Sequence, residues 1–278
     1  MAYDYETLSV ETDGAAMWVT IDNPPINLMT RQLFRDLAKF SAEVEVDDSV
    51  LAVVLQSANP EFFIAHFDVT EILGFPVDGD AERASELSGF HRMCEAFRTM
   101  PKTTIAKIAG RVGGGGSELA MSCDMRFAAQ GQAVVNQMEV PIGILPGGTG
   151  TQRLPRLVGR GRALEIILGG VDLDAETGER WGYFNRALEP DKLDSHVDGL
   201  ARRIASFPPD AVRLAKQATL GAEADPTEGM LDEAFLFQKL LRTPEARPAM
   251  ESFLALGGQT REGELRVGEL NAEVAENR

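Results

Sequence analysis

Residues 109–150 read AGRVGGGGSELAMSCDMRFAAQGQAVVNQMEVPIGILPGGTG, and this stretch contains the densest set of motif residues in the chain. Four consecutive glycines at positions 113–116 lead directly into a run of good helix formers at 117–121. A glycine loop that enters a helix exposes backbone N–H groups at the positive end of the helix dipole, where an anion can be held. The pattern predicts a cradle for an oxyanion or a phosphate. A P-loop would need Gly-Lys-Ser/Thr after the glycines, whereas this chain has Ser-Glu, so the phosphate version is the weaker one.

Two glutamates in this stretch are candidates for acid/base chemistry. Glu118 falls in the first turn of the expected helix, where the helix dipole alone would stabilise an acid. Glu139 lies between apolar stretches, just before a glycine-rich loop. A carboxylate in that setting is either partly desolvated, which raises its pKa, or paired with Arg126 or Arg153. The spacing alone leaves both alternatives open.

Strand and helix patterns alternate through the first half of the chain. The loop at 22–25 contains two prolines, which cannot donate to a sheet ladder, and Thr30 is a suitable N-cap for the helix that follows. The expected elements are a strand at 16–21, a helix after Thr30, a strand at 51–55, a helix at 81–100 and a strand at 104–108. This alternation predicts an α/β fold.

Helical patterns dominate after residue 180. We expect helices at 193–205, 211–220, 228–241 and 244–256, and a charged, partly disordered tail from residue 259. Their apolar stripes need to be buried against the core or against another subunit. The chain is therefore divided into an α/β core over 1–200 and a C-terminal helical region with its tail over 201–278.

The composition and net charge of the chain argue against several classes of function. The chain of 278 residues has 43 acidic and 27 basic side chains, and its net charge of −16 opposes a role on nucleic acid or anionic membranes. No secretory pattern opens the chain and no apolar run approaches 18 residues, so we expect a cytoplasmic protein that does not enter a membrane. The two cysteines and three scattered histidines predict neither a disulfide framework nor a metal site.

Three separated motifs resemble the enoyl-CoA hydratase/isomerase (crotonase) superfamily, in that family's order. They are IAKIAGRVGGGGSELAMSCD at 105–124, VNQMEVPIGILPGGTGTQRLPRLVGRGRALEIILGG at 135–170 and PEARPAMESFLALG at 244–257. The resemblance covers about residues 6–258. It implies a crotonase-like spiral of ββα units whose helical C-terminal region packs in trimers or dimers of trimers.

The resemblance also implies a catalytic apparatus. Glu118 and Glu139 match the family's two catalytic glutamates, which in hydratases add water to an enoyl thioester and form a 3-hydroxyacyl-CoA. Gly115 and Phe67 match the two backbone N–H donors of the family's oxyanion hole. His66 stands where the family usually has glycine, as a third acid/base group or as a surface or structural histidine.

Binding of the acyl-CoA substrate is carried over in the same way, and no cofactor is implied, because coenzyme A is part of that substrate. The expected contacts are Ile26, Leu28, Ala65, Asp68, Val69, Thr70 and Gly147. Thr70 replaces a frequent lysine, which removes one favourable phosphate contact. The alternatives left open are enoyl-CoA isomerisation or other enolate chemistry, and a non-catalytic acyl-CoA-binding protein. RNA binding would need a lysine-rich helix, which the charge of −16 opposes.

Overall fold

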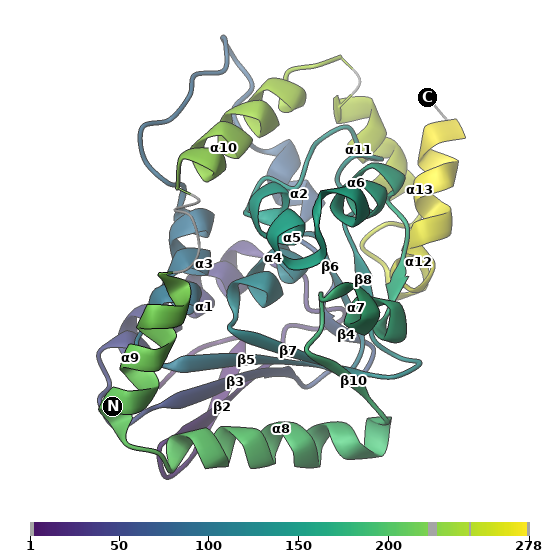
Figure 1. Cartoon of the computed structure of the whole chain (residues 1–278). Coiled ribbons are helices and arrows are strands. Elements are labelled where there is room, and N and C mark those ends of the chain that lie inside the picture. The colour runs from purple at the N-terminus through teal and green to yellow at the C-terminus, as the bar shows by residue number, and fades with distance from the viewer. Residues whose placement is uncertain (1–2, 222–226, 245, 277–278) are drawn as a thin grey trace.

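The larger sheet runs through the lower half of the molecule (Figure 1). This computed structural model describes residues 3–221, 227–244 and 246–276. In spatial order the sheet contains β1 (Leu8–Asp13), β2 (Ala16–Ile21), β3 (Ala52–Ser57), β5 (Thr103–Ile108), β7 (Met125–Ala129) and β10 (Arg186–Leu188). β1 is antiparallel to β2, and the remaining pairs are parallel. The strands predicted at 16–21, 51–55 and 104–108 are confirmed as β2, β3 and β5.

A smaller sheet carries the second strand of each repeated unit. It contains β4 (Phe62–Ile64), β6 (Arg111–Gly113), β8 (Val134–Asn136) and β9 (Leu173–Asp174), with only β9 antiparallel to its neighbour. The pairs β3–β4, β5–β6 and β7–β8 each place one strand in each sheet before a helix follows. Those helices are α2 (Val69–Leu73) and α3 (Gly89–Thr99), then α4 (Gly114–Ser122), then α5 (Gly150–Val158). This spiral of ββα units confirms the expected α/β fold.

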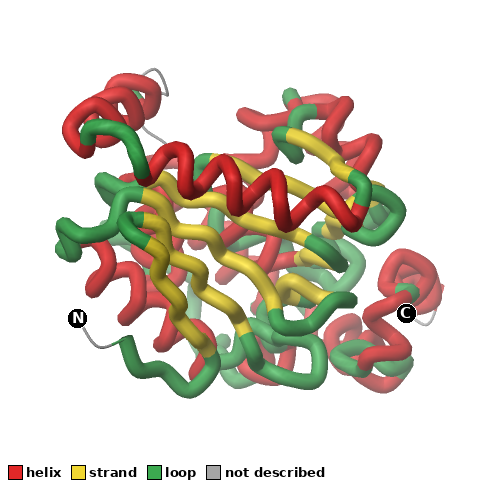
Figure 2. The backbone as a smooth tube through the Cα atoms, turned by 90° about the horizontal axis from the view of Figure 1, so that it is seen from below, coloured by secondary structure: helices red, strands yellow, loops and turns green. Residues whose placement is uncertain are grey.

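Side chains of the larger sheet point alternately into two apolar layers. Met17 and Val19 of β2 face the layer that holds α1 (Arg31–Glu45), whereas Ala16 and Trp18 face α8 (Pro190–Ala205). α1 begins at the predicted N-cap, where the Thr30 hydroxyl accepts the Leu33 N–H at 3.3 Å. Figure 2 shows α8 lying across the other face of the sheet. The sheet is thus covered on both sides, as parallel strands require.

The C-terminal helices are α9 (Pro209–Leu220), α10 (Thr227–Leu241), α11 (Ala246–Ala255), α12 (Arg261–Leu265) and α13 (Val267–Glu276). α11 and α13 bury apolar side chains against the rest of the chain, whereas no residue of α9 is buried. Phe253 of α11 and Leu270 of α13 are fully buried in one cluster with Val69 of α2 and Ile144. The apolar stripes of α11 and α13 are therefore satisfied within the molecule. The short helices α6 (Arg160–Gly169) and α7 (Ala175–Trp181) complete the described elements, and no described helix is long and apolar enough to cross a bilayer.

Two predictions of local structure were wrong. The helix predicted at 81–100 begins only at Gly89, because the Ser88 hydroxyl accepts the His91 N–H at 3.2 Å and caps it there. The tail from residue 259, predicted to be partly disordered, forms α12 and α13. Val267, Leu270 and Val274 recur at helical spacing and are buried, so the apolar face of α13 outweighs the charge of the segment. The division at residue 200 falls within α8 and stays a prediction.

Candidate active site

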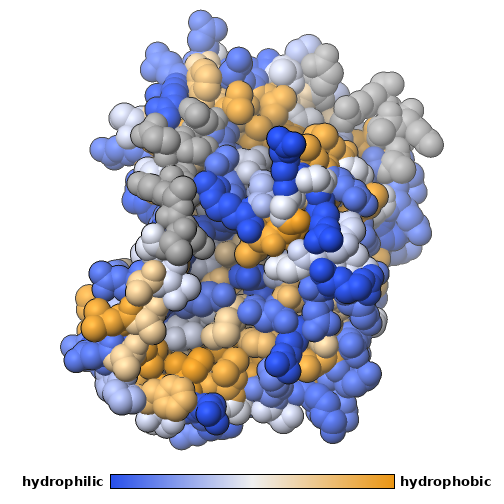
Figure 3. Space-filling view, in the orientation of Figure 1, coloured by the Kyte–Doolittle hydropathy of each residue, from blue (hydrophilic) through white to orange (hydrophobic). Residues whose placement is uncertain are grey.

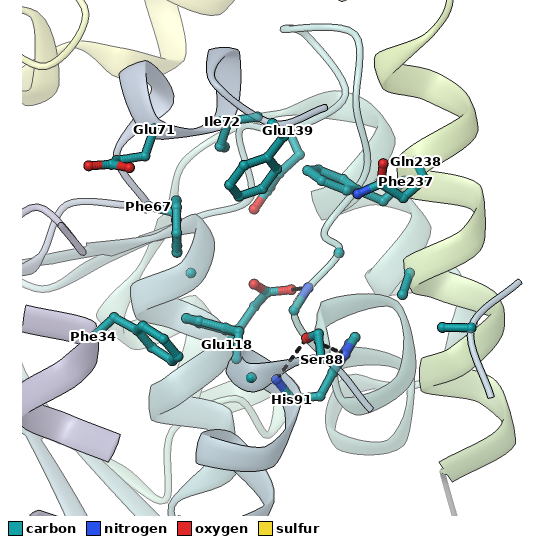
Figure 4. A pocket seen from close by; sticks show the side chains of 18 of the residues that line it. Phe34, Phe67, Glu71, Ile72, Ser88, His91, Glu118, Glu139, Phe237 and Gln238 are labelled. Carbon is teal, nitrogen blue, oxygen red and sulfur yellow. Dashed lines mark hydrogen bonds between the residues drawn. The ribbon is translucent and has the colours of Figure 1, made fainter. Parts of the chain in front are cut away.

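A cavity of about 630 Å³ lies between α1, α3, the start of α4, the turn before α5, and α10. Its lining includes Glu118, Glu139, Phe67, Gly115 and Gly147 from the sequence prediction. Figure 4 shows the Glu118 and Glu139 carboxylates pointing toward one another across this space, with the Phe67 ring to one side. The structure therefore brings both candidate acids and both candidate oxyanion donors to one cavity.

The glycine run allows the backbone at the start of α4 to reach this cavity. Gly114 has a φ of +43°, and a Cβ there would lie 3.1 Å from both Glu139 Oε1 and His66 Cβ. A Cβ on Gly115 would lie 3.2 Å from Phe67 Cβ. Larger residues would strain the first position and crowd the second. The glycines thus set the close approach between the helix and the loop that carries Phe67.

The loop at Phe67 is held by a single parallel bridge to Met29. The Met29 N–H donates to the His66 carbonyl at 2.8 Å, and the Asp68 N–H donates to the Met29 carbonyl at 3.2 Å. In extended backbone the Phe67 N–H then points away from Met29. Within the described residues, neither this N–H nor that of Gly115 in the first turn of α4 has a hydrogen-bond partner. Both groups remain able to donate to a ligand oxygen.

Glu118 is held by the N-terminus of α5. Its Oε1 accepts the N–H groups of Gly148, Thr149 and Gly150 at 2.8, 2.9 and 2.8 Å. Burial and then the nearby Glu233 carboxyl raise the pKa of Glu118, the N–H donors lower it, and the net result is a pKa of about 7. Near neutral pH this carboxyl group is divided between its protonated and ionised forms.

Glu139 is buried with fewer hydrogen bonds. Within the described residues its Oε2 has no hydrogen-bond partner. Burial, followed by the charge of Glu118, raises the pKa of Glu139 well above its ordinary value. The alternative of pairing with an arginine is not realised, because Arg126 donates to backbone carbonyls and Arg153 pairs with Glu95. The arrangement can keep one proton on Glu139 while Glu118 is ionised.

Glu233 and His91 belong to the same site and were missed by sequence reasoning. Glu233 on α10 is 2% exposed and accepts the Thr151 N–H at 2.8 Å and the Thr151 hydroxyl. Burial raises its pKa to about 8, and burial lowers the pKa of His91, whose Nε2 lies 3.4 Å from Glu233. A signal was present in the sequence, since Glu233 falls on the helical stripe of Met230 and Leu241.

Aromatic side chains form much of the cavity wall. The Phe67 ring packs edge-on against Phe90 and Phe75, with centroid separations of 5.8 and 6.3 Å. Phe237 of α10 lies edge-on to Phe75, at a centroid separation of 6.5 Å. These rings come from segments far apart in the sequence and leave an apolar space next to the two glutamates.

Most of the expected coenzyme A contacts lie outside the cavity lining. Ile26, Leu28 and Ala65 pack around Phe62, and Val69 is buried in the C-terminal cluster. Asp68 caps α2, and Thr70 is exposed. Of the expected contacts, Gly147 alone lines the cavity. These contacts stay predictions. His66 is buried behind the lining, with its Nε2 2.9 Å from Glu264 Oε1. No metal-binding group of three His, Cys, Asp or Glu side chains occurs in the described part of the chain.

Comparison with known proteins agrees with this geometry. Residues 11–257 match the family model described as enoyl-CoA hydratase/isomerase. The chain belongs to the enoyl-CoA hydratase/isomerase family. This confirms the resemblance of the three motifs, and the matched residues include both glutamates of the cavity.

Individual relatives within this family extend over most of the chain. The "Probable enoyl-CoA hydratase" of Rhizobium meliloti is 37% identical over 90% of this chain and 96% of its own length. The "Short-chain-enoyl-CoA hydratase" of Clostridium acetobutylicum is 34% identical over 88% of this chain and 93% of its own length. A "putative enoyl-CoA hydratase" from Streptomyces avermitilis of known structure is 37% identical, has a TM-score of 0.90, and aligns over 98% of this chain and 100% of its own.

Proposed function

We propose that the protein hydrates a trans-2-enoyl-CoA to a 3-hydroxyacyl-CoA, with Glu118 and Glu139 as its acid/base pair. One observation carries the proposal: two buried carboxyl groups with raised pKa values face the cavity that also receives the N–H groups of Phe67 and Gly115. A pair that shares one proton near neutral pH can accept a proton and deliver another in a single step.

The hydrogen bonds assign the two roles, because three N–H donors favour an ionised Glu118, whereas Glu139 Oε2 accepts none from the described residues. Ionised Glu118 accepts a proton from water while the water oxygen bonds to C3 of the enoyl thioester. Protonated Glu139 delivers its proton to C2, so the net change is the addition of one water. Transfer of the proton from Glu118 back to Glu139 restores the starting state. The backbone donors on Oε1 hold Glu118 in place and leave Oε2 for the water.

The thioester oxygen gains negative charge during the addition. The N–H groups of Phe67 and Gly115 would donate to it, and each such donor contributes roughly 2 to 4 kcal/mol in comparable sites. Both belong to backbone fixed before substrate arrives, one by the bridge to Met29 and the other by the first turn of α4. Donors that need no rearrangement stabilise the enolate more than water does.

The test follows loss of the conjugated enoyl-thioester absorbance with crotonyl-CoA and longer trans-2-enoyl-CoAs. Wild-type protein should consume the substrate, and Glu118→Gln or Glu139→Gln should lower kcat by about 10²- to 10⁴-fold, because each removes one acid/base group. His196→Gln on α8, on the far side of the sheet, is the control and should keep the wild-type rate. A wild-type protein that binds these thioesters without consuming them would refute the hydratase assignment.

Coenzyme A would enter past the basic side of the cavity. Arg31 and Arg35 of α1 line the cavity, and the Arg31 side chain is 64% exposed although it pairs with Glu71 at 2.6 Å. These cations can meet the phosphates of the substrate in a chain whose overall charge is negative. The substrate would supply coenzyme A itself, and no further cofactor is part of this proposal.

The assembly proposed is a homotrimer or a dimer of trimers. Large apolar side chains remain exposed on single chains, among them Leu168 of α6 at 61% and Leu214 of α9 at 62%. Figure 3 shows hydrophobic residues in orange on the lower part of the face that carries α8 and α9. Analytical ultracentrifugation would test this, and a sedimentation coefficient of a monomer at micromolar concentration would contradict it.

A further inference from the structure

The His66 ring makes hydrogen bonds to two acceptors. Its Nδ1 lies 2.7 Å from the Phe67 carbonyl oxygen, and its Nε2 lies 2.9 Å from Glu264 Oε1. A neutral imidazole carries one N–H, whereas an imidazolium carries two. Both bonds are satisfied together by a cationic His66 facing an ionised Glu264. The Gln259 N–H, which donates to the same Glu264 oxygen at 2.7 Å, favours that charge state.

The pair is enclosed by the protein. The side chains of His66 and Glu264 are 2% and 3% exposed, and the Phe253 ring lies edge-on to His66 at a centroid separation of 5.8 Å. Burial acts to lower the pKa of His66, but Glu264 and the Phe67 carbonyl outweigh it, so the pKa is raised. Burial acts to raise the pKa of Glu264, and His66 reverses this to a net lowering. The other charges acting on the pair are Asp68 on His66 and Arg111 on Glu264.

The same C-terminal segment holds the residues that follow Phe67. The Gln259 side chain accepts the Val69 N–H at 3.0 Å and donates to Asp68 Oδ1 at 2.8 Å. Together with Glu264, it fixes the loop at 66–69 from the side opposite the Met29 bridge. Residues 259–264 therefore brace one wall of the oxyanion site.

The backbone at Phe67 is fixed on both sides by these contacts. The carbonyl before it, that of His66, accepts the Met29 N–H, and its own carbonyl accepts the His66 Nδ1–H. With both neighbouring peptide groups held, the direction of the Phe67 N–H is set. A donor misplaced by about 1 Å loses much of its effect on a transition state.

We propose that His66, held as a cation by Glu264, is a positioning residue that aims the Phe67 N–H at the thioester oxygen. This inference rests on the proposed hydration, since it concerns the oxyanion site of that reaction. It gives a role to the histidine that replaces glycine in the motif, and it assigns a function in the site to the C-terminal segment. His66 does not touch the cavity and acts only through Phe67.

Turnover of variants tests the positioning role. His66→Phe keeps a ring against Phe253 but has no donor, and Glu264→Gln keeps an acceptor but removes the charge. Each should lower kcat by about tenfold to a hundredfold with little change in KM, since the thioester oxygen carries far more charge in the transition state than in the bound substrate. The double variant should lose no more than His66→Phe alone, because the two residues act as one unit. His196→Phe is the matched control and should keep the wild-type kcat.

The pH dependence gives a second measurement. Positioning needs the protonated ring, so kcat should fall where His66 loses its proton. In Glu264→Gln this alkaline limb should move to lower pH, because the charge that raises the pKa of His66 is gone. Ring ¹⁵N NMR, assigned by comparison with His66→Phe, should show both His66 nitrogens protonated at pH 7.5 in the wild-type protein.

Three results would overturn the proposal: a neutral His66 at pH 7.5, an unchanged kcat in correctly folded His66→Phe, or losses that add in the double variant. They differ from failure of the proposed function. If the wild-type protein hydrates no enoyl-CoA, hydration and positioning both fail. An active wild-type protein with unaffected variants refutes positioning alone.

Discussion

Glu118 at the start of α4 and Glu264 of α12 differ in their partners more than in their burial. Glu118 and Glu264 are both enclosed, yet the pKa of Glu118 is raised, chiefly by burial, to about 7, while His66 reverses the effect of burial on Glu264 and lowers its pKa. A buried carboxyl group without a cation retains a proton that chemistry can use, whereas one paired with a cation becomes part of the scaffold. The presence of a cationic partner, and not the degree of burial, therefore distinguishes a carboxyl group that keeps a proton from one that stays ionised.

The largest effect on turnover should come from a side chain that crowds the Glu118 carboxylate. A Cβ on Gly148 would overlap Glu118 Oε2 and lie 2.5 Å from Phe90 Cε1. Gly148→Ala should therefore displace the carboxylate and lower kcat by about a hundredfold or more, measured with crotonyl-CoA. Gly161→Ala in α6 is the matched control, because a Cβ there meets nothing within 4 Å. Equal activity of the two variants would show that the position of Glu118 is not critical.

Glu118 and Glu264 should also affect the free energy of unfolding in opposite directions. In the folded state Glu118 keeps a proton that the unfolded chain releases, so stability declines as pH rises from about 4.5 to 7. Glu118→Gln removes this decline and should stabilise the protein by about 1 to 3 kcal/mol at pH 8, with little effect at pH 4.5.

Glu264→Gln should do the reverse. Its lowered pKa contributes stability above the ordinary glutamate pKa, and that contribution is lost as pH falls through the folded pKa. The substitution leaves a buried histidine without its counter-charge and should cost about 3 kcal/mol at pH 7. Urea unfolding of both variants at pH 5 and pH 8 measures the two effects. Equal changes of the same sign in the free energy of unfolding of both variants would contradict this prediction.

The smallest expected effect concerns Glu233 of α10, whose carboxyl group influences the pKa of Glu118. After burial, its charge is the next cause that raises the pKa of Glu118. Because the pKa of Glu233 is itself about 8, this carboxyl group is mostly protonated at the pH where Glu118 titrates. Glu233→Gln should therefore move the acid limb of the kcat/KM profile to lower pH by only about 0.3 pH units, which is about twofold in rate near pH 6.5. An acid limb that does not move would show that Glu233 has no electrostatic influence on Glu118.

The part of the site that holds Glu118 and Glu139 could be predicted from the sequence. The glycine run, the helix at Glu118 and the apolar setting of Glu139 are local features, and the family motifs lie in the same stretch. Three strands of the larger sheet, β2, β3 and β5, followed from runs of apolar residues and from prolines in loops, whereas β1, β7 and β10 were not predicted. The two- and three-residue strands of the smaller sheet were missed because such short segments show no clear period.

The contacts of Glu233 and Glu264 could not be predicted from the sequence, because they join distant segments of the chain. Glu233 meets Thr151 across 82 residues, and Glu264 meets His66 across 198. No spacing rule links such positions, and the charged composition of the tail hid the apolar face of α13. A buried histidine left two alternatives open until the structure showed its partners.

The separation of His66 and Glu264 by 198 residues also bears on how the protein is made. A ribosome adds residues from the N-terminus onward at about 5 to 20 per second, so the strand leading to His66 emerges many seconds before Glu264 exists. During that interval the histidine has no counter-charge and is not held as a cation. The glycine run and both glutamates can be in place while the wall at Phe67 is still unbraced. Maturation of the site is therefore a late event in biosynthesis, timed by translation of α12.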